Sequence, residues 1–180
     1  LQTIMLVYLS TRESFHEDVL SGGIDDIIHD KMKQKLKLSA SPSEIRSWRQ
    51  SLQHIDSIIN DFEIPANCGV GIETQIPNTD KRIDFVISGE DENGTSNAIV
   101  IELKQWEEAY PTEKPDVVKT YLGGRVRETS HPSYQAWSYA ALLKDFNETV
   151  YEENIQLKPC AYLHNYIGGG ILESDVHQAY

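Results

Sequence analysis

The sequence predicts an α/β domain with the element order helix, three strands, helix and strand, after an N-terminal helical extension. A long amphipathic helix beginning near residue 41 comes before three strand-like segments that end at residue 104. A second helix begins near residue 131, and a last strand-like segment begins near residue 156. A chain of 180 residues is long enough for one domain with a buried core.

The composition is that of an ordinary globular domain, with 39% hydrophobic and 24% charged residues. No run of about 18 apolar residues and no signal-peptide pattern occurs, so we expect a cytoplasmic protein without a membrane span. Cys68 and Cys160 form no Cys-x-x-Cys pair, which speaks against a zinc site or a disulfide framework. The formal net charge of −12 opposes phosphate binding over the whole surface, although a small basic patch or another domain can supply such contacts.

The first forty residues predict a short strand and two helices. Residues 6–10 are an apolar run, which indicates a strand or a tucked N-terminal arm. Helices are expected over residues 12–20 and 24–38, separated by Gly22 and Gly23.

The clearest helix start in the chain is at Ser41. Ser41 suits the N-cap, Pro42 suits the first helical position, and Glu44 completes a Ser-x-x-Glu capping box. An apolar stripe then keeps helical spacing for about five turns, which predicts a helix packed on the core. Its members are Ile45, Trp48, Leu52, Ile55, Ile58, Ile59 and Phe62.

Three strand-like segments follow this helix. Residues 70–77 predict one strand, and residues 82–88 and 98–104 predict a β-hairpin with Asn93 and Gly94 at the tip of its acidic turn. Strict alternation along a strand places every second side chain on a common face. The apolar sets expected on common faces are Val70, Ile72, Thr74 and Ile76 in the first strand and Ile83, Phe85 and Ile87 in the second.

The predicted hairpin brings two acids and a lysine to one place. Glu102 and Lys104 share a face because they are two apart, and antiparallel pairing places Asp84 opposite the Glu102 end. Neighbouring carboxylates repel each other, and a bridging hard cation such as Mg²⁺ removes that repulsion and can activate water. The competing interpretation is a solvated hairpin with ordinary surface charges, although unpartnered charges on apolar strands are costly. Glu73, on the preceding strand, either extends this polar site or lies on the wet face of an edge strand.

The segments around the second helix are less clearly marked. Residues 107–116 carry two prolines and predict a loop, and residues 117–122 are short and ambiguous. A glycine pair with two nearby arginines then begins a stretch that we expect to be a mobile loop or a plain surface turn. Residues 156–163 predict a strand, and the glycine-rich tail from residue 165 has the character of a linker.

The second helix begins near His131 and Pro132. Gln135 and Tyr139 lie four residues apart, so they are neighbours on one helical face. The residues expected to face the core are Tyr134, Trp137, Ala141 and Leu142.

With these elements in this order, the sequence resembles the PD-(D/E)XK nuclease superfamily, whose shared core is α-β-β-β-α-β. Residues 83–85 (Ile-Asp-Phe) carry the first acid, with isoleucine where the motif has proline, and residues 102–104 (Glu-Leu-Lys) carry the second part. Residues 135–139 match the Gln-x-x-x-Tyr helix motif of the RecB-like branch. The resemblance covers residues 41–163 and implies a restriction-endonuclease-like core with a mixed central sheet flanked by helices.

The resemblance implies a metal site. Asp84 and Glu102, helped by the Leu103 carbonyl, are expected to hold one or two Mg²⁺ or Mn²⁺ ions. Glu73 lies where this superfamily often has an extra acidic residue, so it joins the expected metal ligands.

It also implies roles for three further side chains. Lys104 is expected to position and activate the water that attacks a phosphodiester. Gln135 and Tyr139 are expected to orient Lys104, the metal ligands or a substrate phosphate from the facing helix, as outer groups commonly do.

The whole chain also resembles the N-terminal region of bacterial proteins that carry a Schlafen-group DNA/RNA helicase domain downstream. The stretches that carry this likeness are SEIRSWRQSL, KRIDFVI, VIELKQW, HPSYQAWSYAALL and PCAYLHNY. The likeness implies an extension over residues 1–40, a nuclease-like core over 41–165, and a tail over 166–180 towards a helicase domain of the same polypeptide. No Gly-x-x-x-x-Gly-Lys-Ser/Thr phosphate loop occurs in these residues.

Three functional classes remain open from the residues. The first is a metal-dependent nuclease acting on nucleic acid, with DNA favoured over RNA. The second is a catalytically silent nucleic-acid-binding or protein-interaction module that keeps the nuclease fold, and the third is hydrolysis of a small phosphate ester. The intact trio of Asp84, Glu102 and Lys104 favours the first.

Overall fold

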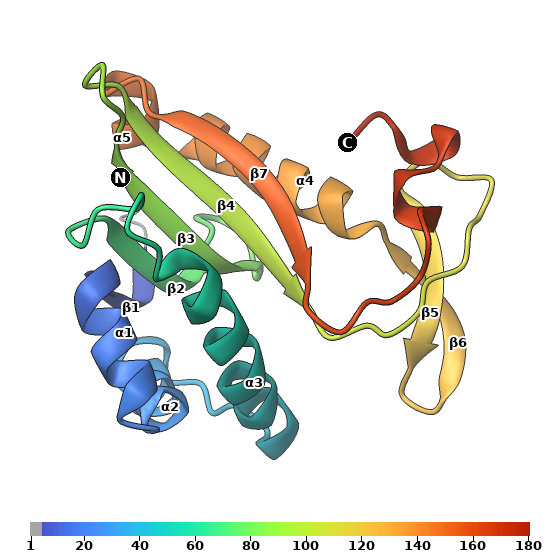
Figure 1. Ribbon diagram of the computed structural model, residues 1–180, viewed down its shortest axis with the longest axis horizontal. Helices are drawn as coiled ribbons and strands as arrows, with labels where there is room; N and C mark the ends of the chain where they lie inside the picture. Colours follow the sequence, from blue (N-terminus) through green and yellow to red (C-terminus); the bar gives the residue numbers. More distant parts are fainter. Residues whose placement is uncertain (1–4) are drawn as a thin grey trace.

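The computed structural model describes residues 5–180, and a five-stranded mixed sheet forms its centre (Figure 1). The strands lie in the order β1–β2–β3–β4–β7, and all neighbours are antiparallel except β4 and β7, which are parallel. The bounds are Met5–Thr11 for β1, Gly69–Gln75 for β2, Arg82–Glu90 for β3, Ser96–Lys104 for β4 and Gln156–Leu163 for β7. The predicted α/β class with a mixed sheet flanked by helices is therefore confirmed.

Helices cover both faces of this sheet (Figure 1). Helices α1, α2 and α3 pack on one face, and α4 packs on the other and leads into the short α5. Their bounds are Arg12–Leu20, Ile24–Leu36, Pro42–Ile59, Pro132–Phe146 and Glu148–Glu152, in the order α1 to α5. The predicted N-terminal strand and helices are confirmed, whereas α5 was not predicted.

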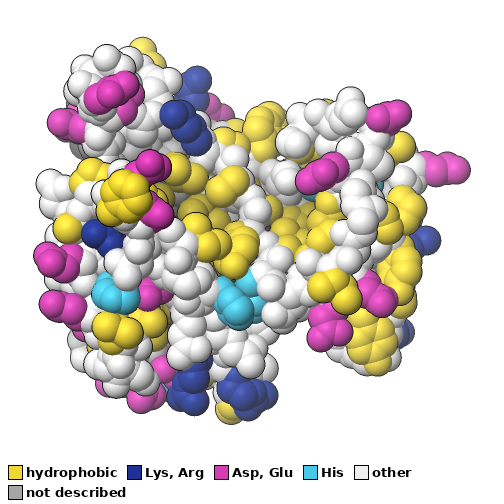
Figure 2. All heavy atoms as spheres, viewed as in Figure 1, with side chains coloured by type: hydrophobic (Ala, Val, Ile, Leu, Met, Phe, Trp, Pro, Cys, Tyr) yellow, Lys and Arg dark blue, Asp and Glu magenta, His cyan; other side chains and the backbone are white. Residues whose placement is uncertain are grey.

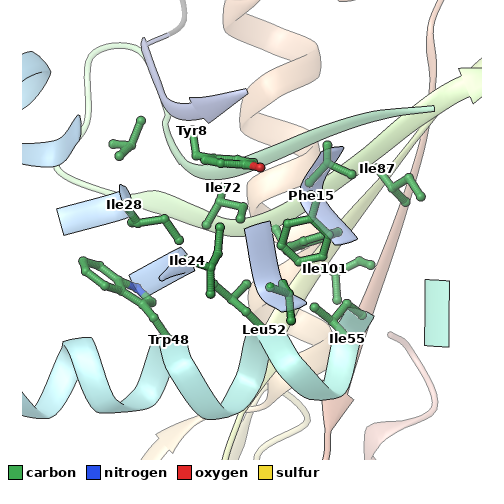
Figure 3. Packing of buried hydrophobic residues seen from close by; sticks show 14 of the residues in the cluster. Tyr8, Phe15, Ile24, Ile28, Trp48, Leu52, Ile55, Ile72, Ile87 and Ile101 are labelled. Carbon is green, nitrogen blue, oxygen red and sulfur yellow. The ribbon is translucent and has the colours of Figure 1, made fainter. Parts of the chain in front are cut away.

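The larger hydrophobic core lies between the sheet and helices α1 to α3 (Figure 3). Phe15 sits at its centre, with its ring edge-on to Tyr8 at 6.2 Å and to Phe85 at 5.5 Å between centroids. Leu52 and Ile55 of α3 close the core from the other side. Each such fully buried side chain stabilises the fold by roughly 1.5–3 kcal/mol.

Helix α3 begins as its sequence predicts. Ser41 caps it through the Glu44 backbone N–H, and the Glu44 carboxylate accepts the Ser41 backbone N–H at 2.8 Å in return. The predicted apolar stripe is wrong at its end, because Ile58 is 49% exposed and Phe62 is 93% exposed. The helix stops at Ile59, so Phe62 no longer follows the helical spacing that placed it on the core.

The core face of α4 differs in part from the prediction. Its buried residues include Ala136, Tyr139, Ala140 and Leu143. Of the predicted set, Leu142 packs against the smaller core as expected, whereas Tyr134, Trp137 and Ala141 do not belong to it. The small side chains of Ala136 and Ala140 let the helix approach the sheet closely, whereas Trp137 is 47% exposed. Tyr134 and Trp137 pack instead on Tyr180 at the end of the chain.

Two strands do not keep one set of side chains on one face. In β2, Ile72 belongs to the larger core, whereas Ile76, just beyond the strand, belongs to the smaller core under α4. In β3, Ile83 lies in the smaller core and Phe85 in the larger. The predicted face sets are therefore wrong, and the change in β2 coincides with Glu73, whose φ of 52° interrupts the extended backbone.

A second sheet is the hairpin of β5 (Val117–Leu122) and β6 (Arg125–Ser130). Gly123 and Gly124 connect the strands with φ values of 57° and 85°. Two consecutive positive φ angles suit the tight hairpin turn that matches strand twist, and glycine adopts them without a steric penalty. The expected surface turn is thus confirmed at Gly123 and Gly124, whereas the residues that follow them form a regular strand, β6.

The C-terminal tail folds back onto the domain in two 3₁₀ turns, Ile171–Glu173 and Asp175–His177. The His177 ring is within hydrogen-bond distance of the Pro115 carbonyl at 2.7 Å and packs on the buried His131 ring at 4.8 Å. These contacts seat the tail beside α4 and the segment before β5. Its continuation into another domain stays a prediction.

Candidate active site

Three acidic side chains meet at one end of the central sheet. Glu73 of β2 faces Asp84 of β3 in the register that pairs Thr74 with Ile83. Asp84 in turn precedes Phe85, which pairs with Ile101, so Asp84 lies opposite Glu102 as the sequence predicts. A cavity of about 510 Å³ opens here and is bordered by residues of both α3 and α4.

Asp84 takes the place of a ladder hydrogen bond. The pairing of β3 with β4 ends at Phe85 and Ile101, and the Asp84 carboxylate accepts the Leu103 backbone N–H at 2.8 Å. This contact fixes the carboxylate beside Glu102. Burial raises the pKa of Asp84, while Lys104 and the Leu103 N–H oppose that rise.

Glu102 is the most crowded acid of the site. Its side chain is 3% exposed, and its Oε1 accepts the Lys104 ammonium at 2.6 Å and the Gln135 amide at 2.6 Å. Its Oε2 is buried and accepts no hydrogen bond from any side chain or backbone group in residues 5–180. Burial and then the charge of Asp84 raise the pKa of Glu102 to about 8.

Helix α4 supplies the outer support of Glu102. Gln135 donates both to Glu102 and to the Tyr139 hydroxyl, the latter at 3.0 Å, so the two residues are neighbours as predicted. Lys81 stands over the Tyr139 ring at 5.7 Å from its centroid. Gln135 of the predicted helix motif and Lys104 of the predicted Glu-x-Lys segment therefore donate to the same atom, Glu102 Oε1.

Glu73 is held by two partners that the sequence did not reveal. Its Oε1 accepts the Trp48 indole N–H at 2.8 Å, and its Oε2 faces Arg82 Nε at 2.7 Å. Burial and then the charge of Asp84 raise the pKa of Glu73 to about 7, against the lowering effect of Arg82. Both oxygens of Glu73 therefore already have a partner, in contrast to Glu102 Oε2.

The strained backbone at Glu73 explains how it reaches the site. A non-glycine residue in the left-handed region costs roughly 1–2 kcal/mol, which the two side-chain bonds offset. Trp48 comes from α3, 25 residues away in the chain, and no local spacing links it to Glu73. Arg82 lies two residues before Asp84, so the alternation of the strand predicts that both side chains are on the same face, although it does not predict the contact of Arg82 with Glu73.

The donor set of this site fits a hard cation. Two carboxylates and a backbone carbonyl are oxygen ligands, and Mg²⁺ typically takes one or two protein carboxylates with waters and phosphates completing its shell. Glu102 lines the cavity, and its buried Oε2 has no hydrogen-bond partner within residues 5–180. No group of three or more His, Cys, Asp or Glu side chains is arranged around a metal position within residues 5–180.

No family model, no curated protein and no solved structure matches this chain. The likeness to the PD-(D/E)XK superfamily thus rests on the motifs at residues 83–85, 102–104 and 135–139. Within the described part of the chain, none of the helices has both the length and the apolar composition needed to cross a membrane.

Proposed function

We propose that the chain is a Mg²⁺- or Mn²⁺-dependent nuclease domain of the PD-(D/E)XK superfamily that hydrolyses phosphodiester bonds of nucleic acid, with DNA favoured over RNA. The observation that carries the proposal is the convergence of Asp84, Glu102, Lys104 and Gln135 in one cavity, with one carboxylate oxygen buried and unpartnered. A bound cation would give this buried acceptor the partner that the protein does not supply.

The order of elements supports the restriction-endonuclease-like core. Elements α3, β2, β3, β4, α4 and β7 follow one another as in the α-β-β-β-α-β core, with β5, β6 and α5 as insertions. The parallel pairing of β4 with β7 completes a mixed sheet with α3 and α4 on opposite faces. In this arrangement the three motifs lie on their expected elements.

The cation would be held by Asp84 and Glu102, with the Leu103 carbonyl as a third ligand. When bound, such an ion polarises a phosphoryl oxygen and lowers the pKa of its water. Asp84 is preorganised for this role by the Leu103 N–H, and Glu102 by the Gln135 amide. Ligands that are already fixed lose little conformational entropy when they bind.

Lys104 carries the remaining chemistry of the proposal. Its ammonium is held at 2.6 Å from Glu102 and its side chain keeps 20% of its surface exposed, so it faces the cavity where substrate enters. There it can position the attacking water and stabilise charge that develops on the phosphate oxygens. Tyr139 and Gln135 keep Glu102, and through it Lys104, in place.

The test is cleavage of single- and double-stranded DNA and RNA with Mn²⁺ by the wild type and by Asp84→Ala, Glu102→Ala and Lys104→Ala. The matched control is Asp91→Ala, which removes an exposed acid from the far end of the same hairpin. We expect loss of cleavage in the three site variants and full activity in the control. Activity that survives Asp84→Ala or Glu102→Ala contradicts the proposal.

A second candidate is the catalytically silent module. It is favoured by the net charge of −12 and by the ion pair that already occupies Glu102 Oε1. Under this alternative the wild type binds nucleic acid or a protein partner and cleaves none of the four substrates. A helicase domain in the same polypeptide remains the proposed partner for either function.

A further inference from the structure

We propose that Gln105 is a positioning residue, which holds Lys104 in the active-site cavity by anchoring the end of β4 to α3. The proposal rests on the proposed nuclease function, in which Lys104 positions the attacking water. Strand β4 ends at Lys104, and Gln105 is the first residue beyond it. Backbone at the end of an element opens readily unless other contacts hold it.

The side chains at the end of β4 alternate between the two faces of the sheet. Glu102 and Lys104 share one face, where Gln135 of α4 donates to Glu102. Leu103 packs against the larger core on the α3 face, and Gln105, two residues later, lies on that same face. Gln105 therefore contacts α3 while its neighbour Lys104 faces the cavity.

The Gln105 amide is within hydrogen-bond distance of three acceptors on α3. Its nitrogen lies 2.9 Å from the Ser47 hydroxyl, 3.0 Å from the Ser47 carbonyl and 3.1 Å from the Ser51 hydroxyl. Ser47 and Ser51 are four residues apart, so one turn of the helix presents both hydroxyls to the same amide. The contacts span 58 and 54 residues of sequence and therefore join two elements that no local structure links.

The same turn of α3 also holds Glu73. Trp48 follows Ser47 and donates its indole N–H to Glu73 at 2.8 Å. Ser47 and Trp48 both line the active-site cavity. By binding this turn, Gln105 fixes the placement of Lys104 relative to the α3 side of the cavity.

The end of β7 adds further contacts. The Gln105 carbonyl accepts the Asn165 side-chain amide at 3.4 Å, and a His164 ring nitrogen lies 3.1 Å from the Ser51 hydroxyl. His164 also stacks on His54 of α3 at 4.3 Å between ring centroids, and Figure 2 shows histidine at the surface between α3 and the end of β7. Both the side chain and the backbone of Gln105 are thus held.

Lys104 is consequently held at both ends of its side chain. Its ammonium lies 2.6 Å from Glu102, and its backbone is joined to the anchored Gln105. Fixing a lysine costs side-chain entropy, and an ordered backbone leaves fewer positions for the ammonium to sample. Without the anchor the ion pair remains but its place in the cavity shifts, and a misplacement of about 1 Å can slow a reaction by about 100-fold.

The test compares the wild type with Gln105→Leu, which removes the amide but keeps a side chain of similar size. The matched control is Gln53→Leu, which replaces an exposed glutamine on α3. Single-turnover cleavage with Mn²⁺ gives the maximal rate and the substrate concentration at half-saturation. We expect Gln105→Leu to lower the maximal rate by about 10-fold or more and to leave half-saturation within about 2-fold, because the substrate contacts remain. Gln53→Leu is expected to match the wild type.

A second readout does not depend on cleavage. In metal-free protein labelled with ¹³C-lysine, the NMR signal of the Lys104 side chain is identified by its loss in Lys104→Arg. We expect this signal to move towards those of exposed lysines in Gln105→Leu and to keep its position in Gln53→Leu. Melting temperatures verify that each variant is folded.

An unchanged Lys104 signal in Gln105→Leu overturns the proposal, whether or not the wild type cleaves nucleic acid. Wild-type cleavage whose maximal rate is the same in Gln105→Leu also overturns it, as does a change confined to half-saturation, and the nuclease function stands in both cases. A shifted Lys104 signal in a protein that cleaves no substrate supports the hold on Lys104 and defeats the nuclease function alone.

Discussion

The two ends of the β3–β4 hairpin carry the same kinds of side chain in opposite electrostatic states. At the turn, exposed Asp91 accepts backbone N–H groups, first that of Thr95 at 2.9 Å, and these bonds lower its pKa. At the other end, burial raises the pKa values of Asp84 and Glu102. Carboxylates become candidate ligands when they are placed where water cannot solvate them and where another acid is near.

The largest expected difference between the two ends is catalytic. Lys104→Ala removes the cation beside Glu102 and is expected to lower the cleavage rate by about 100-fold or more, because charge on the phosphate loses its partner. Lys158→Ala is the matched control, since Lys158 is exposed on β7 and outside the cavity. The measurement is the single-turnover rate with Mn²⁺, and equal rates for Lys104→Ala and wild type contradict the role of Lys104.

Metal affinity is expected to depend on pH. Glu102 has a pKa of about 8 without metal, so at lower pH a cation must displace a proton from it. The apparent Mn²⁺ affinity should therefore fall by roughly 50-fold between pH 8 and pH 6 for one such proton. Calorimetry at the two pH values measures this ratio, and the buffer ionisation heat reports the released proton. A pH-independent affinity argues that Glu102 is not a ligand.

The same raised pKa should appear in the stability of the metal-free protein. The pKa of Glu102 is higher in the folded protein than its ordinary value of 4.5, so the stability it contributes is present at low pH and is lost as pH rises towards 8. Glu102→Gln removes this loss and should raise stability at pH 8 by about 4 kcal/mol, or roughly 8–16 °C in melting temperature.

Thermal unfolding at pH 6 and pH 8 provides the comparison. The gain from Glu102→Gln should be smaller at pH 6, where more of the wild-type Glu102 is already protonated. Asp91→Asn serves as the control at the turn, since its pKa is shifted in the other direction. A gain that is larger at pH 6 than at pH 8 contradicts the assigned state of Glu102.

The smallest expected effect is at the outer support. Tyr139→Phe removes a hydroxyl that accepts a hydrogen bond from Gln135 but leaves the Gln135–Glu102 contact in place. Loss of one such neutral hydrogen bond corresponds to about 1 kcal/mol, so cleavage should slow by about 5-fold. The matched variant Gln135→Leu also removes the bond to Glu102 and should slow cleavage further. Equal cleavage rates for the two variants indicate that the hydrogen bond from Gln135 to Glu102 does not contribute to the rate.

Local signals were sufficient to predict much of the fold and the central trio. The capping box at Ser41 predicted the start of α3, and the register of the hairpin placed Asp84 opposite Glu102. The four-residue spacing predicted that Gln135 and Tyr139 meet. Each of these features depends on residues that are close in sequence or that lie on one pair of strands. Sequence patterns are therefore sufficient to predict them.

The features that were missed depend on contacts distant in sequence. The left-handed backbone of Glu73 is held by Trp48 of α3 and Arg82 of β3, and the strand's alternation gives no sign of it. The face of α4 is set by how closely Ala136 and Ala140 approach the sheet, which outweighs the greater size of Trp137. Hydrophobicity alone favours the larger residues and therefore selects the wrong face.

The measurement that tests the central claim most directly is a Mn²⁺ titration by calorimetry at pH 8, with wild type, Asp84→Ala, Glu102→Ala and Asp91→Ala. We predict saturable binding by the wild type and by Asp91→Ala, and loss of binding in both site variants, because the ion needs both buried carboxylates. Binding that persists in Asp84→Ala and Glu102→Ala, or no binding by the wild type at millimolar Mn²⁺, contradicts the claim that this end of the sheet is a metal site.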